Sequence, residues 1–75
     1  MMYKVKLKFC NRDGAEAETV RTIASHCWQN AISEALARNP YADMPKGYGL
    51  YKALVWNGNN RFMGSQLFVL PWNLG

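Results

Sequence analysis

The sequence has few of the residues that build metal sites or disulfide frameworks. Of its 75 residues only two are cysteines and one is a histidine. The cysteines, Cys10 and Cys27, form no CxxC pair. These counts argue against a disulfide-stapled fold and a structural zinc site, both of which need more ligands at closer spacing. We expect both thiols to be reduced.

Long apolar runs and acidic residues are also scarce. No stretch approaches the length of a membrane-spanning helix, and the N-terminus lacks the apolar segment of a signal peptide. We therefore expect a cytoplasmic protein. Nine basic residues against five acidic ones give a net charge of +4. This charge permits an anionic partner but falls short of a polybasic tail.

The residue clusters that catalysis requires are missing as well. The five acids are scattered, and the stretch GYGLYK at 47–52 has no following helix to complete a phosphate site. Ser25, His26 and Cys27 are the one group of nucleophile and base types, but neighbours on a helix do not face each other. We expect an inert cysteine beside a surface histidine, no enzymatic activity and no cofactor.

What is present is apolar and aromatic. Hydrophobic residues make up 49% of the chain, and three Trp, four Tyr and three Phe are included. A chain of this length buries only about 60% of its unfolded surface. Residues 1–75 are therefore predicted to form a single small domain with a thin core that depends on large rings.

The N-terminal part predicts a β-hairpin. In YKVKLKF, residues 3–9, apolar side chains alternate with lysines, which is typical of a strand with one buried face. A turn is expected at 11–14 because Gly14 accepts a positive φ, and a second strand at 15–24.

The register of this hairpin stays open. If Asn11 pairs with Gly14, Lys4 lies opposite Arg21. With a one-residue bulge at the turn, Lys6 and Lys8 instead face Glu18 and Glu16 in that order.

A helix is predicted at 26–38, with Ser25 as its N-cap and Pro40 ending it. Its apolar stripe has helical spacing: Trp28, Ala31, Ile32, Ala35 and Leu36. A loop follows at 39–49.

The C-terminal half predicts a second hairpin. A strand is expected at 50–56, a turn at 57–60 and a return strand from Arg61 to Leu70, with a bulge or bend at Gly64–Ser65. The fold class is thus α+β, in the order β-β-α-β-β, with one helix packed on one face of a four-stranded antiparallel sheet.

The lysines allow two interpretations. Alternate strand residues lie about 6.6 Å apart, near two nucleotide rises of about 3.4 Å, so Lys4, Lys6 and Lys8 can follow a phosphate backbone, with Arg21 extending the patch. Alternatively they only keep the sheet soluble. We prefer the second, because single-strand binders need stacking aromatics beside the charge, and the aromatics of the first strand point to the buried face.

The C-terminal aromatics exceed what one helix covers. The remainder either wrap the thin core and cover its ends or stay exposed as a protein interface. The loop at 40–49 and the tail at 71–75 are the expected contact segments, and the tail also permits a homodimer. The predicted interface residues are Tyr41, Tyr48, Tyr51, Arg61 and Trp72.

The layout of a lysine-alternating strand, a polar turn, VRTIAS leading into a helix with Ala31 and Ala35, and a hairpin resembles the small ββαββ proteins of bacteriophages. Some of these are anti-CRISPR or other host-takeover inhibitors. The resemblance implies a non-enzymatic inhibitor or adaptor that occludes a surface of a host protein, often one that handles nucleic acid. Many such inhibitors are acidic DNA mimics, whereas this chain is basic, which favours docking on an acidic or apolar surface.

Overall fold

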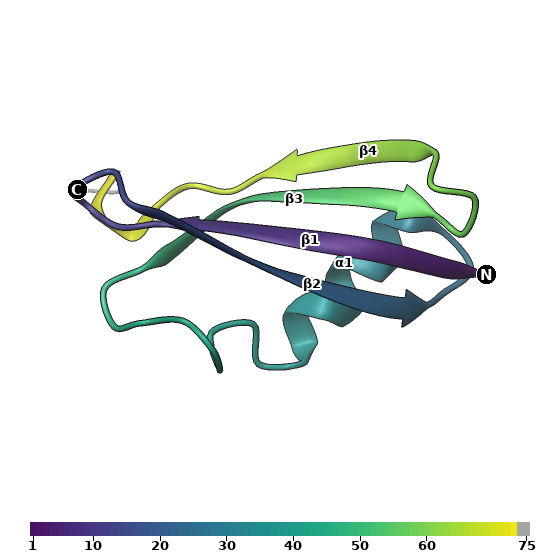
Figure 1. Cartoon of the computed structure of the whole chain (residues 1–75), viewed down its shortest axis with the longest axis horizontal. Coiled ribbons are helices and arrows are strands. Elements are labelled where there is room, and N and C mark those ends of the chain that lie inside the picture. The colour runs from purple at the N-terminus through teal and green to yellow at the C-terminus, as the bar shows by residue number, and fades with distance from the viewer. Residues whose placement is uncertain (74–75) are drawn as a thin grey trace.

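A computed structural model describes residues 1–73 and confirms the predicted α+β class. The four strands form one antiparallel sheet in the order β2-β1-β3-β4, and the single helix lies on one side of it (Figure 1). The elements are β1 (Met2–Cys10), β2 (Glu16–Ala24), α1 (Trp28–Ala37), β3 (Gly49–Asn57), β4 (Phe62–Leu67) and a 3-10 turn (Pro71–Asn73).

The first hairpin adopts neither of the predicted registers. Asn11 pairs with Ala15 rather than Gly14, and its side-chain oxygen accepts hydrogen bonds from the amides of Asp13 and Ala15. Gly14 has a φ of 87°, and this left-handed residue creates a three-residue loop. As a result Lys8 lies opposite Glu18.

The helix begins two residues later than predicted, and its cap is Cys27 rather than Ser25. Extended backbone at Cys27 lets its Sγ accept from the amide of Asn30 at 3.4 Å. The Ser25 hydroxyl instead accepts from the Asn30 side chain. At the other end Asn39, with a φ of 51°, leaves the helical conformation directly before Pro40, as predicted.

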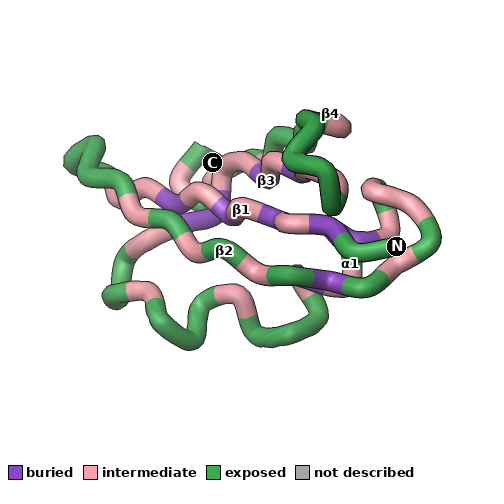
Figure 2. Tube along the Cα trace, turned by 45° about the vertical axis from the view of Figure 1, so that its right-hand side comes forward, coloured by how far each residue is buried: buried purple, intermediate pink, exposed green. Residues whose placement is uncertain are grey.

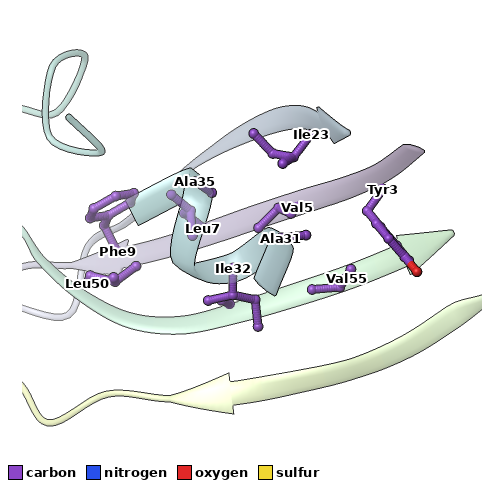
Figure 3. Close-up of a cluster of buried hydrophobic side chains, with 11 residues drawn as sticks. Tyr3, Val5, Leu7, Phe9, Ile23, Ala31, Ile32, Ala35, Leu50 and Val55 are labelled. Carbon is purple, nitrogen blue, oxygen red and sulfur yellow. The ribbon is translucent and has the colours of Figure 1, made fainter. Parts of the chain in front are cut away.

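The core lies between α1 and the sheet (Figure 3), and β1 alternates between buried and half-buried residues (Figure 2). The predicted helix stripe is confirmed: Ala31, Ile32 and Ala35 are buried, and their neighbours Trp28 and Leu36 pack against the core. The core residues are Tyr3, Val5, Leu7, Phe9, Ile23, Ala31, Ile32, Ala35, Leu50, Ala53 and Val55.

The second hairpin turns at 57–60 as predicted, but β4 is shorter and its bulge lies earlier. Val55 pairs with Gly64 while Trp56 pairs with Phe62, so Met63 is the extra residue. β4 ends at Leu67, three residues before the predicted end.

The chain then folds back onto the start of β3. A Cβ added at Gly49 would approach side chains of Leu70, Pro71 and Trp72 at 3.0–3.3 Å. Residues 74 and 75 of the predicted contact tail lie outside the described residues. In the described chain no helix is long and apolar enough to cross a membrane.

Candidate functional site

One side of the sheet is left open, because α1 packs on the opposite side and none of the other described elements covers it (Figure 1). Cross-strand partners share a face, so the paired strands define three rows across this open face. The rows are Thr22–Lys4–Trp56–Phe62, Val20–Lys6–Leu54–Ser65 and Glu18–Lys8–Lys52–Leu67.

The open face gathers cations. Lys4, Lys6 and Lys8 lie along β1, as the alternating pattern predicts, and β3 adds Lys52 directly opposite Lys8. Like charges placed opposite each other on neighbouring strands destabilise the pair. An anion bound above Lys8 and Lys52 would relieve that repulsion.

Aromatic rings accompany the cations. The Nζ atoms of Lys4 and Lys6 lie 5.1 and 5.5 Å from the Trp56 ring centroid, within cation–π range. Phe62 meets Trp56 edge-on, with centroids 5.6 Å apart. The aromatics of the first strand, Tyr3 and Phe9, are buried as predicted, and the rings beside the lysines come instead from β3 and β4.

The acids of the open face are confined to β2. Glu18 lies 3.7 Å from Lys6, and Glu16 accepts a hydrogen bond from the Tyr51 hydroxyl. That hydrogen bond, together with burial and the negative charge of Glu16, raises the pKa of Tyr51 to about 12. No acidic residue follows Asp43 in the sequence, so the β3–β4 half of the face carries only positive charge.

Arg21 does not extend the lysine patch, and this part of the prediction is wrong. The observed register pairs Arg21 with Val5, on the helix-covered side of the sheet. There its guanidinium donates to the carbonyls of Arg38 and Asn39 at 2.8 and 3.1 Å. These carbonyls follow the last helical residue, so Arg21 ties β2 to the C-terminus of α1.

The predicted protein-interface residues are not brought together. Tyr41 is 46% exposed, but its hydroxyl accepts from the Leu50 amide and its ring packs edge-on against Phe9. Tyr48 packs against the core. Tyr51 donates its hydroxyl hydrogen bond to Glu16, at the β2 edge of the open face.

The other two lie on different elements. Arg61 is exposed beside the β3–β4 turn. Trp72 is half-buried near Gly49, with the Arg12 guanidinium 5.7 Å from its ring centroid.

The sequence contained two signals for the residues that were missed. Lys52, Leu54 and Trp56 alternate with buried Ala53 and Val55, which marks their shared outward face. The absence of acids after Asp43 marks a one-sign surface.

Cys27 serves as the helix cap, and within residues 1–73 no three His, Cys, Asp or Glu side chains gather as a metal site would require. The chain matches no protein-family model, no curated protein and no solved structure.

Proposed function

We propose that the protein binds nucleic acid through the open face, without catalysis and in the cytoplasm. The proposal is based on the position of four lysines on this face. Lys4, Lys6 and Lys8 follow one another along β1, and Lys52 of β3 lies directly opposite Lys8, on a face that also presents Trp56. Four ammonium groups on one face, outnumbering two acids at its β2 edge, match a chain of phosphates in sign and spacing.

The arrangement favours a polyanion over a single ion. The lysines are spread along two adjacent strands rather than converging on a point. The Lys4 ammonium group also donates a hydrogen bond to the Asn60 side chain at 3.3 Å, which restricts its position. Phosphate contacts of this type release counterions, so affinity falls steeply as salt rises.

Titration of labelled oligonucleotides at about 50 and 200 mM salt, read by fluorescence anisotropy, tests the proposal. We expect saturable binding that weakens with salt, and a log–log salt slope shallower by about 0.7–0.9 in Lys6→Ala. Lys46→Ala, which removes the same charge from the exposed loop after α1, is the matched control and should keep the full slope. Absence of binding at the lower salt, or equal loss in both variants, contradicts the proposal.

A protein-binding inhibitor or adaptor, the function implied by the resemblance to small phage proteins, is a second candidate. It is supported by the outer edge of the sheet, where β4 carries no charged residue. Leu67 at the end of β4 is 73% exposed, and Val69, just beyond it, is 66% exposed. Uncharged edge strands pair readily with an added strand. Capture of a discrete partner from nuclease-treated bacterial lysate should then be lost in Leu67→Lys and retained in Lys6→Ala.

A further inference from the structure

Phe62 is an apolar ring without a role in the core. It lies on the open face, is 52% exposed, and touches Trp56 edge-on rather than burying its own ring. The buried side chains of β3, those of Ala53 and Val55, lie on the other side of the sheet. A half-exposed phenylalanine on a solvent-facing strand offers a flat surface on which a planar ligand can stack.

The two aromatics of the open face have different surroundings. Trp56 is half-buried and holds the ammonium groups of Lys4 and Lys6 within 5.1–5.5 Å of its centroid. Phe62 lies on the outermost strand and forms an edge-to-face pair with Trp56. About half of the Phe62 surface remains exposed to solvent. The open face therefore presents cations toward β1 and β3 and an available ring toward β4.

This asymmetry fits a single strand and not a duplex. In a duplex the bases are paired inside the stack, so a flat face meets only phosphates and Phe62 gains no contact. In a single strand the phosphates can follow the lysines while the bases turn outward over β4. The acids Glu16 and Glu18 lie at the β2 edge, on the opposite flank, and repel a backbone placed there.

We infer that the ligand of the open face is single-stranded nucleic acid, with its phosphates on Lys4, Lys6, Lys8 and Lys52 and a base stacked on Phe62. The inference rests on the proposed function and adds to it the strandedness of the ligand. Ser65 is exposed on the same face of β4 as Phe62 and offers a hydroxyl group to the edge of a stacked base.

The test compares three labelled ligands at about 50 mM salt: a twelve-nucleotide oligothymidylate, the matching oligouridylate and a twelve-base-pair duplex. We expect tighter binding of both single strands than of the duplex. In Phe62→Ala the affinity for single strands should fall about 5- to 150-fold, the range for losing one stacked base, while duplex affinity stays the same. Phe62→Tyr, which keeps the ring, should restore single-strand binding.

The outcomes separate this inference from the proposed function. Equal binding of all three ligands, with Phe62→Ala unchanged, overturns the single-strand inference and leaves nucleic-acid binding intact. If none of the three ligands binds, both the single-strand inference and the proposed function are wrong. Circular dichroism of each variant checks that the sheet is folded. A preference between the two single strands reports on the 2′-hydroxyl and the thymine methyl group together, and it supports the inference in either direction.

Discussion

At the scale of single residues, Gly64 is a position in β4 that has no room for a side chain. A Cβ built there would lie 2.7 Å from two ring carbons of Trp28, closer than side-chain carbons approach. The indole therefore packs directly on the backbone of β4 and extends the cover of α1 to the outer strand.

Gly64→Ala should consequently destabilise the protein by about 1–3 kcal/mol, because the Trp28 ring has to move or the strand has to shift. Urea denaturation measures the change. Gly58→Ala is the matched control: the nearest atom to its added Cβ is the Met2 carbonyl oxygen at 3.7 Å, an ordinary contact. Equal stability of the Gly64 variant and the native protein would show that the indole is not held against the strand.

Tyr51 is a second residue with a measurable signature. Its pKa is raised from 10.0 to about 12, first by the hydrogen bond to Glu16, then by burial and the negative charge of that carboxylate. A pKa raised on folding means that the native state keeps a proton that the unfolded state has lost. Stability from this group is therefore complete below pH 10 and falls as the pH rises toward 12.

In Glu16→Gln the pKa of Tyr51 should fall back toward 10.0, since the charged acceptor is gone. The ultraviolet absorbance of tyrosinate follows the titration, and subtracting the curve measured with Tyr51→Phe in each background isolates this ring. Identical titration curves for the native protein and the Glu16→Gln variant would contradict the assignment of the shift to the carboxylate.

At the scale of elements, the strands and the helix were predictable because their periods are local. The alternation in 3–9 and the spacing of Ala31 and Ala35 depend only on neighbouring residues. The register was not predictable, because a positive φ at Gly14 was expected but does not by itself fix whether the loop closes on Gly14 or on Ala15. Closure on Ala15 moves Arg21 away from the predicted binding patch.

The open face was not fully predictable either, for a different reason. Which strand lies beside β1 is decided by packing across the whole sheet, and the sequence pattern within each strand does not encode it. The sheet order β2-β1-β3-β4 brings Lys52 and Trp56 next to the lysines of β1. The lysines of β1 were thus predicted, whereas Lys52 and the rings beside them were missed.

Arg21→Ala tests the element-level role of this residue. Loss of its two hydrogen bonds to the carbonyls of Arg38 and Asn39 should lower the free energy of unfolding by about 1–2 kcal/mol. Oligonucleotide affinity and its salt slope should stay the same. Arg61→Ala, at an exposed turn position, should change stability by less than about 0.5 kcal/mol. A shallower salt slope in Arg21→Ala would return this residue to the binding surface.

At the scale of the whole molecule, binding and stability are linked, because a ligand held only by the folded sheet stabilises that state. An oligonucleotide at about 100 times its Kd contributes about 2.7 kcal/mol, which corresponds to a rise in Tm of about 10–20 °C for a domain of this size. The rise should disappear at high salt. Differential scanning fluorimetry measures it, and a Tm unaffected by saturating ligand would contradict binding to the folded state.

The pairing of β1 with β3 also has a consequence for how the molecule is assembled. Each hairpin is local, but Tyr3 pairs with Asn57, most of the length of the described chain away. Closing such a large loop is the entropically costly step of folding and sets the contact order of the domain. On the ribosome the three β1 lysines emerge long before Trp56. A nascent chain that has not yet reached β3 therefore carries three of the four lysines of the open face without its aromatic rings.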